Sequence, residues 1–348
     1  MKIAPLLRAF RQRPGLVPRL IHTGQHFSPE MSDVFFSELG IGAPDVNLEI
    51  GAGSPVWQTA EIMKRLDELF AAERPALVLV VGDVNSTLAA ALVASKHEIP
   101  LAHVEAGLRS FDRTMPEEIN RIVTDSLSDY LFVTEPSGVE NLRCEGVDEK
   151  RIFLAGNVMI DTLFASLERA AQSGVLARLG LVPQRYALAT LHRPSNVDDE
   201  ERLRSLVSVL CQVSADLPVV FSVHPRTRQR MQSAAIAADG LILTPPLGYL
   251  DFLRLTSEAR VVLTDSGGIQ EETSALRVPC LTLRENTERP ITTTQGSNRL
   301  IGTGPQAILA AARQALSEPA RAGRTPDLWD GRAAVRIAGI LEEILLGG

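Results

Sequence analysis

The chain has 348 residues, of which 45% are hydrophobic and 22% charged, and its formal net charge is -7. This composition is ordinary for a soluble globular protein, and no basic stretch interleaved with aromatic residues indicates nucleic acid as the main partner. The three cysteines form no C-x-x-C pair and fit a reducing compartment, and no apolar run approaches the roughly 18 residues of a membrane helix. We therefore expect a cytoplasmic protein with no zinc site and no membrane partner.

Short apolar strands alternate with amphipathic helices along the first half of the chain. The run A-L-V-L-V-V at 76–81 is apolar throughout, which is typical of a parallel strand covered on both faces. In chain order the pattern predicts helix 1–10, strand 20–23, helix 30–39, strand 46–50, helix 56–72, strand 76–81, helix 86–96, strand 101–104, helix 117–127, strand 130–134, helix 136–144, strand 152–155 and helix 157–172.

The alternation restarts after residues 174–184, which we interpret as a domain boundary. The second half predicts strand 186–190, helix 200–214, strand 219–223, helix 226–238, strand 241–244, helix 249–257, strand 260–264, helix 268–276, strand 280–283, helix 305–316 and helix 333–346. Two such series predict an α/β protein with two doubly wound domains, 1–173 and 174–330, followed by a final helix in 331–348. Ligands of such sheets bind beyond the carboxyl ends of the strands, so we expect the site in a cleft between the halves.

The stretch V-V-L-T-D-S-G-G-I-Q-E-E, Val261 to Glu272, has the order strand, glycine turn, helix start. Thr264, Asp265 and Ser266 are candidate helix N-caps, and the two glycines that follow let the backbone approach a ligand. Free N–H groups at the start of a helix favour an anion, so this turn is a candidate phosphate site. An ordinary turn between strand and helix is the alternative.

Acidic residues follow several predicted strands, and strand ends facing a cleft are where carboxylates perform acid–base chemistry. Asp83 follows V-L-V-V-G and Glu105 follows L-A-H-V in neighbouring units of one half. A single aspartate at such a position is usually a helix cap, whereas the pair suggests catalysis. In the segment R-T-M-P-E-E-I-N-R, Glu117 and Arg121 lie four residues apart on one helix face, as a surface ion pair or as a carboxylate positioned by a guanidinium.

Basic residues also follow strands in the second half. His192 and Arg193 come after one apolar strand, and His224-Pro225-Arg226 repeats the arrangement after another. Either group could receive a departing phosphate, although a lone histidine at a strand end is more often structural. The charged loop 284–290 indicates anion binding, or otherwise solvated charge. Glycines at 51 and 53 suggest a dinucleotide fingerprint, but a third glycine is lacking and a proline interrupts, so no nicotinamide cofactor is predicted.

Eight short motifs together make the chain similar to the non-hydrolysing UDP-N-acetylglucosamine 2-epimerases, from residue 1 to about residue 302. They are T-G-Q-H at 23–26, G-D-V-N-S-T at 82–87, H-V-E-A-G-L-R-S at 103–110, M-P-E-E-I-N-R at 115–121, G-N-V-M-I-D-T-L at 156–163, H-R-P-S-N-V-D at 192–198, D-S-G-G-I-Q-E-E at 265–272 and T-E-R-P at 287–290. The resemblance implies a glycosyltransferase-B fold, with two Rossmann-like domains facing across a cleft, a final helix crossing back to the first domain, a homodimer, and no cofactor or metal.

The resemblance also implies roles for individual residues. Asp83, Glu105 and Glu117 match the acid–base carboxylates, and Arg121 and His192 match residues at the reacting sugar and diphosphate. Lys2 matches a lysine near the diphosphate. The remaining matches are the diphosphate-binding turn at Ser266, Gly267 and Gly268, the ribose-binding carboxylate at Glu272, and the region of a second, activating UDP-N-acetylglucosamine at Gln25 and His26.

The activity implied is reversible epimerisation of UDP-N-acetylglucosamine to UDP-N-acetylmannosamine, by elimination and re-addition of UDP through a glycal. Four alternatives stay open: a 2-epimerase of a related UDP-amino sugar such as a diacetamido uronate, a hydrolysing epimerase, a retaining glycosyltransferase, and a UDP-sugar-binding protein without turnover.

Two features depart from the family pattern. Members normally begin with a strand and G-T-R-P-E before the lysine that matches Lys2, and this chain starts at that lysine. We therefore expect the first N-terminal strand and its arginine to be missing, because the start is misassigned or because this form is impaired. The sequence H-P-R-T at 224–227 departs in a region tied to the activating site, which leaves activation open.

Overall fold

The computed structural model describes residues 1–24, 38–318 and 323–347, and the chain forms two compact units. Unit 1 comprises Met1–Thr162 together with Asp327–Gly348, and unit 2 comprises Leu163–Pro326. The chain passes from one unit to the other within a helix, earlier than the boundary expected at residue 173. In the described part of the chain, no helix is long and apolar enough to span a membrane.

Unit 1 is built on parallel strands with helices on both faces. A two-stranded sheet pairs β1 with β2, and a four-stranded sheet has the order β3-β4-β5-β6. Its elements are α1 (Ile3–Arg11), β1 (Ile21–His22), β2 (Val46–Asn47), α3 (Pro55–Ala72), β3 (Val78–Val81), α4 (Asn85–Lys96), β4 (Leu101–Ala106), α5 (Pro116–Leu127), β5 (Tyr130–Val133), α6 (Pro136–Cys144), η1 (Glu149–Arg151), β6 (Ile152–Leu154), the start of α7 (Val158–Ala171), and α16 (Ala333–Leu346).

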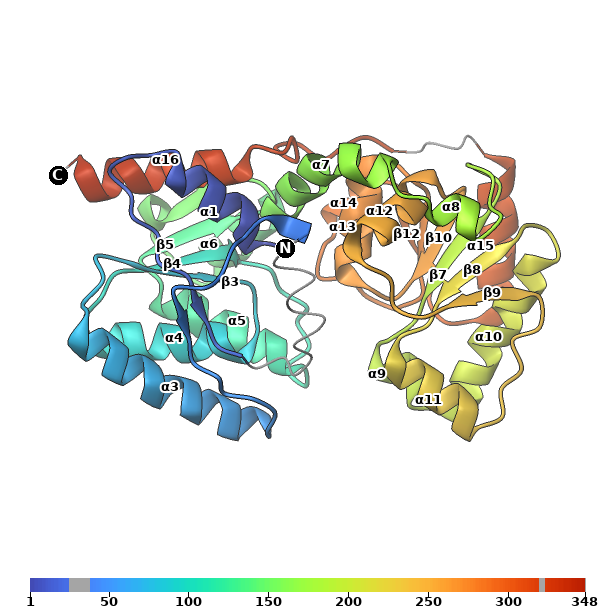
Figure 1. Cartoon of the computed structure of the whole chain (residues 1–348), viewed down its shortest axis with the longest axis horizontal. Helices are drawn as coiled ribbons and strands as arrows, with labels where there is room; N and C mark the ends of the chain where they lie inside the picture. The colour runs from blue at the N-terminus through green and yellow to red at the C-terminus, as the bar shows by residue number, and fades with distance from the viewer. Residues whose placement is uncertain (25–37, 319–322, 348) are drawn as a thin grey trace. The chain divides into compact units, whose positions relative to one another are not determined.

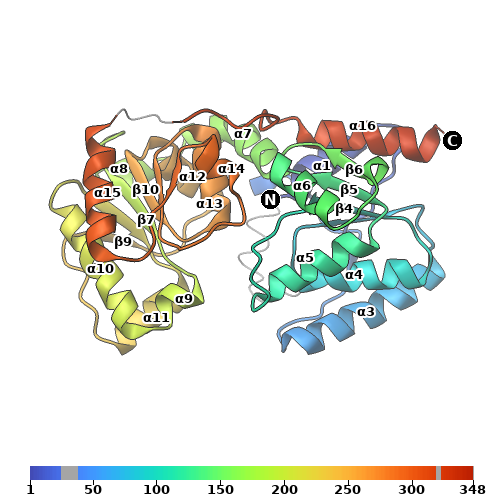
Figure 2. The same cartoon turned by 180° about the vertical axis from the view of Figure 1, so that it is seen from behind.

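The alternation of side chains along β3 separates the two apolar layers of unit 1. Val78 and Val80 pack against α3 and α4, whereas Leu79 and Val81 face the layer formed by α1 and α16. Views from both sides show α1 and α16 over one face of the sheet and α3 and α4 over the other (Figure 1, Figure 2). Asp161 of α7 fixes the start of α16, because its carboxylate accepts hydrogen bonds from two backbone N–H groups there.

Unit 2 contains one six-stranded parallel sheet in the order β12-β11-β10-β7-β8-β9. Its elements are α8 (Val175–Arg178), β7 (Ala187–Thr190), α9 (Pro194–Val197), α10 (Glu200–Ser214), β8 (Val219–Ser222), α11 (Pro225–Ser233), β9 (Leu241–Thr244), α12 (Tyr249–Glu258), β10 (Val261–Thr264), α13 (Gly267–Leu276), β11 (Cys280–Thr282), α14 (Ile291–Thr294), β12 (Asn298–Leu300) and α15 (Pro305–Ser317).

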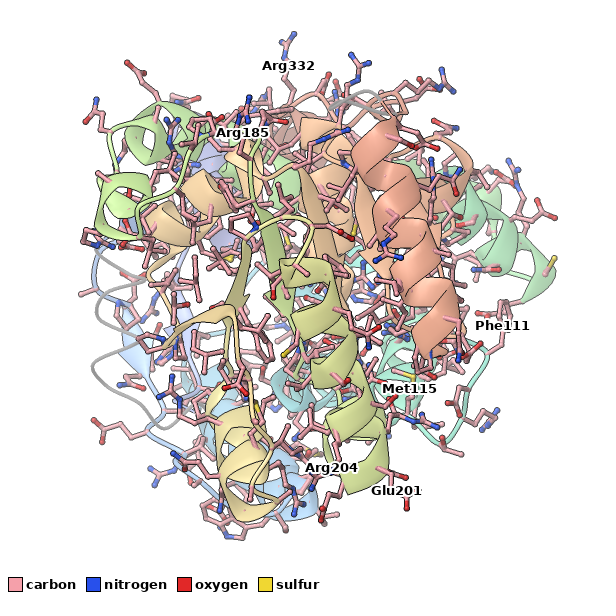
Figure 3. The ribbon with its side chains drawn as sticks, turned by 90° about the vertical axis from the view of Figure 1, so that its right-hand side faces the viewer. Phe111, Met115, Arg185, Glu201, Arg204 and Arg332 are labelled. Atoms are coloured by element: carbon pink, nitrogen blue, oxygen red, sulfur yellow. The ribbon has the colours of Figure 1, made fainter. Side chains whose placement is uncertain are left out.

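The central strands of unit 2 are buried on both faces. Val261 and Leu263 of β10 join the apolar core under α10 and α15, whereas Val262 joins the core under α8, α12 and α13. On the outer side of α10, Glu201 and Arg204 project away from the sheet (Figure 3). The strands β7 and β10 are neighbours although they are distant in sequence, and successive strands run outward from them in opposite directions. The loops after β7 and β10 therefore lie at a topological switch point, where ligands bind in open parallel sheets.

Most predicted elements are confirmed, and the exceptions are local. Helix 226–238 is wrong at its end, because α11 stops at Ser233 and Ala235 takes a left-handed conformation with φ +47°. Strand 46–50 contracts to the two residues of β2. The predicted helix 30–39 lies largely outside the described residues. The short elements α8, α9, α14 and β12 were not predicted.

Candidate active site

The turn after β3 brings together residues from three elements of unit 1. Gly82 has φ +76°, its N–H donates to the Val104 carbonyl at 3.0 Å, and Lys2 Nζ lies 3.2 Å from the place a Cβ atom would take. A side chain at this position would therefore be strained by the backbone and would crowd Lys2. The glycine lets the ammonium group approach the turn that carries Asp83.

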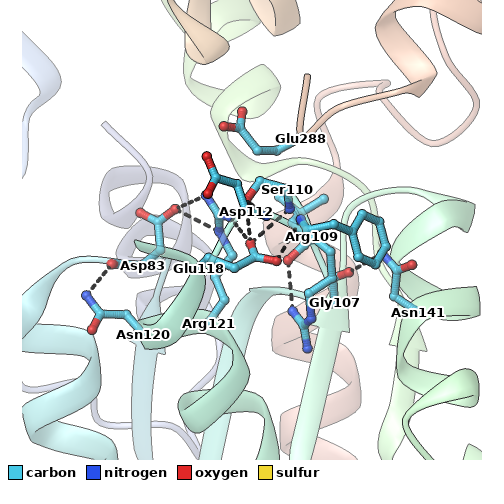
Figure 4. A network of polar contacts seen from close by, with 12 residues as sticks. Asp83, Gly107, Arg109, Ser110, Asp112, Glu118, Asn120, Arg121, Asn141 and Glu288 are labelled. Carbon is cyan, nitrogen blue, oxygen red and sulfur yellow. Dashed lines mark hydrogen bonds and ion pairs between the residues drawn. The ribbon is translucent and has the colours of Figure 1, made fainter. Parts of the chain in front are cut away.

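Asp83 is held by two side chains of α5. Arg121 donates from Nε and Nη2 to Asp83 Oδ2 at 3.0 and 2.8 Å, and Asn120 donates to the Asp83 carbonyl at 2.8 Å (Figure 4). The third arm of Arg121, Nη1, donates to Glu118 Oε2 at 2.7 Å. The ion pair that the i,i+4 spacing allows between Glu117 and Arg121 is not among the ion pairs of the described residues. Glu117 instead lies half-buried in the first turn of α5.

Glu118 is a buried partner of Arg121 that could not be identified from the sequence. Its carboxylate is buried and accepts hydrogen bonds from Ser110 N, Ser110 Oγ and Phe111 N, each at 2.9 Å. These bonds hold the loop before α5, in which Phe111 has φ +58° and is 80% exposed. Only the three-dimensional path of the loop shows that Glu118 points inward, because the sequence contains two adjacent glutamates with similar spacing to Arg121.

Glu105 lies inside β4 rather than after it, so the predicted end of this strand at residue 104 is wrong. The pairing of β4 with β5 shifts register between Val104 and Ala106, and Glu105 has φ +73°. A non-glycine residue in this conformation costs about 1–3 kcal/mol, and bulges of this kind re-aim a side chain next to a functional site.

The carboxylate of Glu105 is nearly enclosed, with 3% of the residue exposed. Its Oε2 atom lies 2.5 Å from Lys2 Nζ. Its Oε1 atom is buried and makes no hydrogen bond to any described residue. A buried carboxylate oxygen without a donor is unfavourable by a few kcal/mol, and it is available to accept a proton. The structure thus brings Asp83, Glu105, Arg121 and Lys2 into one group on unit 1.

The glycine turn of unit 2 connects β10 to α13. Ser266 is the N-cap residue, but its side chain makes no capping hydrogen bond, and the Thr264 hydroxyl accepts from Ser266 N at 3.0 Å. Arg289 Nη1 lies 3.1 Å from the place of a Cβ atom on Gly267. The turn therefore presents unblocked N–H groups of a ten-residue helix beside a guanidinium, an arrangement that favours an anion.

Asp265 serves the neighbouring loop instead of capping α13. Its buried carboxylate accepts hydrogen bonds from the backbone N–H groups of His192 and Arg193 and from Asn196 Nδ2. It also lies 2.9 Å from His192 Nδ1, while the His192 side chain stays 38% exposed. Burial opposes the charge, but these hydrogen bonds outweigh it and lower the pKa of Asp265. Asp265 thereby fixes the orientation of His192 at the switch point.

Two further carboxylates of unit 2 are buried, but their pKa values are shifted in opposite directions. Burial raises the pKa of Glu272 to about 7, and its Oε1 atom accepts a hydrogen bond from the Tyr249 hydroxyl at 3.2 Å. Burial also opposes the charge of Glu288, but Arg284, Arg289 and the more distant Arg193 lower its pKa to about 2. The interpretation of loop 284–290 as solvated charge is therefore wrong, because its central carboxylate is buried and ion-paired.

Gln25 and His26 lie outside the described residues, so the structure gives no place for the predicted activating site. Over the described ranges, no group of three or more His, Cys, Asp or Glu side chains is arranged to hold a metal ion.

The parallel sheets and the groups at their strand ends define a doubly wound α/β protein with two Rossmann-like units. A family model described as UDP-N-acetylglucosamine 2-epimerase matches residues 8–342, and the chain belongs to this family. The UDP-N-acetylglucosamine 2-epimerase of Methanocaldococcus jannaschii is 40% identical over 351 residues, which cover 98% of this chain and 95% of that protein. The UDP-2,3-diacetamido-2,3-dideoxy-D-glucuronate 2-epimerase of Pseudomonas aeruginosa is 40% identical over 322 residues, covering 91% and 89%.

Solved structures agree with this assignment. The crystal structure of the M. jannaschii enzyme in complex with UDP-GlcNAc and UDP has a TM-score of 0.89 at 40% identity and covers 98% of this chain and 95% of that one. The enzyme from Neisseria meningitidis bound to UDP-GlcNAc has the same TM-score at 29% identity, with 100% and 96% covered. The fold is accordingly of the glycosyltransferase-B type.

Proposed function

We propose that this chain catalyses the reversible epimerisation of UDP-N-acetylglucosamine at C2 to give UDP-N-acetylmannosamine. Elimination and re-addition of UDP transfer no hydride, so this route requires no nicotinamide. The observation that carries the proposal is the group on unit 1, in which Glu105 keeps a buried, unpartnered oxygen beside the Asp83–Arg121 pair. Family membership and the relatives named above supply the substrate class.

The chemistry requires the C1–O bond to break before the C2 proton leaves, because no carbonyl group adjoins C2 to stabilise a carbanion. Loss of UDP places positive charge next to C2 and makes that hydrogen acidic. A carboxylate then removes the proton to form a glycal, and UDP adds back while a proton is delivered to the opposite face. We assign these proton transfers to Asp83, Glu105 and Glu117 without ordering them.

Stabilisation of the departing diphosphate is assigned chiefly to unit 2. The Ser266–Gly268 turn offers backbone N–H groups, and His192 is held by Asp265 with its Nε2 atom free of that contact. Glu272 is assigned to the ribose hydroxyls, because a buried carboxyl that already pairs with a tyrosine hydroxyl suits further hydroxyl partners. Lys2 is assigned to the diphosphate, which would compete with Glu105 for the same ammonium group.

A second candidate substrate is a UDP-linked diacetamido glucuronate. The specific observation in its favour is the P. aeruginosa relative, whose identity equals that of the M. jannaschii enzyme. A uronate carries an additional carboxylate on the sugar, so it needs an extra cationic partner that N-acetylglucosamine does not need.

Incubation with each UDP-sugar, followed by chromatography of the products, tests the proposal. Conversion of UDP-N-acetylglucosamine to the manno isomer at a higher kcat/KM than the uronate supports it. A higher kcat/KM for the uronate would transfer the assignment to that substrate. Release of UDP with free N-acetylmannosamine would indicate a hydrolysing enzyme, transfer to an acceptor would indicate a glycosyltransferase, and binding without products would indicate a binding protein.

We also propose that the protein acts in the cytoplasm as a homodimer and that Gln25 and His26 contribute to a second UDP-N-acetylglucosamine site. A solution mass twice that of the monomer supports the first proposal. Sigmoidal dependence of the rate on UDP-N-acetylglucosamine, lost when Gln25 and His26 are replaced by alanine, supports the second. A monomeric mass would contradict the homodimer, and hyperbolic kinetics would contradict the second site.

A further inference from the structure

A buried ion pair links β4 and α5 in unit 1. His103 and Asp125 are fully enclosed, and His103 Nδ1 lies 2.6 Å from Asp125 Oδ1. The other ring nitrogen, Nε2, lies 2.9 Å from the carbonyl oxygen of Gly82. A carbonyl oxygen only accepts hydrogen bonds, so Nε2 carries a hydrogen and donates it to Gly82.

The Asp125 carboxylate, which faces His103 Nδ1, has two further partners. Its Oδ2 atom lies 2.7 Å from Arg109 Nη1 and accepts from Gly107 N at 3.0 Å. Burial opposes the charge, yet His103 and Arg109 together lower the pKa of Asp125. Nδ1 faces this carboxylate and Nε2 faces the Gly82 carbonyl, so the ring of His103 bridges Asp125 and the turn after β3. Arg109 also pairs with Glu145, so its guanidinium links two carboxylates.

The pair bonds to both strand ends that carry the proposed acid–base residues. The Gly82 carbonyl directly precedes Asp83, and Gly107 N lies two residues after Glu105. Asp125 itself belongs to α5, the helix that also supplies the Asp83 partner shown in Figure 4. One buried contact therefore connects the turn after β3, the bulge of β4 and α5.

Both of those strand ends are strained or tightly constrained. Gly82 and Gly107 have φ of +76° and +78°, and a Cβ atom on Gly107 would lie 2.3 Å from the Gly138 carbonyl oxygen. Between them Glu105 adopts φ +73°. Strained backbone persists only where surrounding contacts over-determine it. The hydrogen bonds of His103 and Asp125 are such contacts.

We propose that His103, through its hydrogen bond to the Gly82 carbonyl, is a positioning residue that sets the placement of Asp83 relative to Glu105. The inference rests on the function proposed above, and it assigns a role to a residue that touches no reacting atom. A purely structural role predicts that any loss of activity follows the loss of stability, whichever ring nitrogen loses its partner. A positioning role depends on the Nε2 bond in particular.

Two conservative variants separate these roles. In His103→Gln the distal amide nitrogen replaces Nε2 and keeps the bond to Gly82, whereas in His103→Asn the amide nitrogen replaces Nδ1 and keeps only the bond to Asp125. We expect kcat for C2 epimerisation to be about ten-fold lower in His103→Asn than in His103→Gln, which is the effect of one buried hydrogen bond. UDP affinity, measured by calorimetry, is expected to be the same in the two variants, and the thermal midpoint is expected to be lower in His103→Gln, because that variant loses the hydrogen bond to the buried Asp125 carboxylate. Equal kcat values, or a difference in kcat that follows a difference in thermal midpoint, would overturn the proposal.

A measurement on the unmutated protein covers the case in which the variants do not fold or the proposed reaction is not observed. In protein labelled with 15N and 13C, NMR at the assay pH should show a hydrogen on Nε2 of His103 and a scalar coupling from Nε2 to the Gly82 carbonyl carbon. An Nε2 atom without a hydrogen, or the absence of this coupling, would overturn the inference. Absence of any product from the unmutated protein, with the coupling present, would instead count against the proposed function alone.

Discussion

The proposed acid–base carboxylates of unit 1 and the proposed ribose-binding carboxylate of unit 2 have different partners. In unit 1, Asp83 contacts Arg121 and Glu105 contacts Lys2. The Oε1 atom of Glu105 is buried and makes no hydrogen bond to any described residue. In unit 2, Glu272 is as buried as Glu105, yet its hydrogen-bond partner is a tyrosine hydroxyl, and no ion pair involves it within the described ranges. The difference suits proton transfer in the first unit and the binding of neutral hydroxyl groups in the second.

A comparison within unit 2 shows that burial alone does not set the charge of a carboxyl group. Glu272 and Glu288 are both almost inaccessible, but the pKa is about 7 for the first and about 2 for the second. Arginines around Glu288 account for the difference. The four predictions that follow test the contrast, from the largest expected effect to the smallest.

Replacing Glu105 by glutamine should have the largest effect. The amide keeps the shape but cannot take or deliver a proton, so we expect kcat to fall about a thousand-fold, within the range of acid–base catalysis. UDP affinity should change little, because the diphosphate groups are assigned chiefly to unit 2. Glu200→Gln, at an exposed i,i+4 pair with Arg204, serves as the matched control with normal kcat. Retention of more than a tenth of kcat in Glu105→Gln would remove Glu105 from the acid–base set.

Replacing Glu288 by glutamine should destabilise unit 2 by about 3–5 kcal/mol, because Arg284 and Arg289 then lose a buried partner. In the folded protein the pKa of Glu288 is about 2, below its ordinary value of 4.5. Its charge therefore contributes stability that is present above about pH 4.5 and is lost as the pH falls towards 2. Urea unfolding at pH 7 and pH 3 measures both effects. A decrease in the free energy of unfolding of less than 1 kcal/mol at pH 7 would show that the ion pairs of Glu288 are not important for stability.

Replacing Glu272 by glutamine should change the pH dependence of stability in the opposite direction. The folded pKa of about 7 lies above the ordinary value of 4.5, so the folded state holds the proton more tightly than the unfolded state does. The wild-type protein should lose up to about 3 kcal/mol as the pH rises from 4.5 to 7, and Glu272→Gln should not show that loss. The measurement is the difference in urea midpoint between the two proteins at pH 5 and pH 7.5. A constant difference would contradict the raised pKa.

Replacing Asp265 by asparagine should have the smallest effect of the four. Asparagine has a single acceptor oxygen, so it cannot accept both from His192 Nδ1 at the Oδ1 position and from Arg193 N and Asn196 Nδ2 at the Oδ2 position, and His192 loses its fixed orientation at the switch point. We expect kcat/KM to fall about ten-fold, the value of one hydrogen bond to a charged group. Asp216→Asn, at an exposed pair with Arg313, is the control. Unchanged steady-state kinetics in Asp265→Asn would mean that His192 needs no orientation.

The regular elements could be predicted from sequence because their signals are local. Helices 136–144, 200–214 and 333–346 agree with α6, α10 and α16 at both ends. By contrast, α11 is rich in arginine and glutamine, so little in the sequence marked its early end at Ser233. The three residues of β12, N-R-L, form no apolar run, and their pairing with β11 supplies the strand.

The site could be predicted only in part from the sequence, because several of its features depend on contacts between distant residues. The acidic residues at 83 and 105 could be identified because each follows an apolar run. The bulge at Glu105 could not, because a one-residue change of register leaves no mark in the hydrophobic pattern. The choice of Glu118 over Glu117 as the partner of Arg121 depends on the loop that Glu118 binds. The role of Asp265 depends on β7 lying beside β10, which is a long-range contact.

The most direct test of the account is the reaction in deuterated water. UDP-N-acetylglucosamine is incubated with the protein, and the recovered UDP-sugars are analysed by NMR and mass spectrometry. The account predicts one deuterium at C2 in sugar that is still joined to UDP, in both the gluco and the manno isomers, with Glu105→Gln strongly impaired. Formation of the manno isomer without deuterium at C2, or normal exchange in Glu105→Gln, would contradict it.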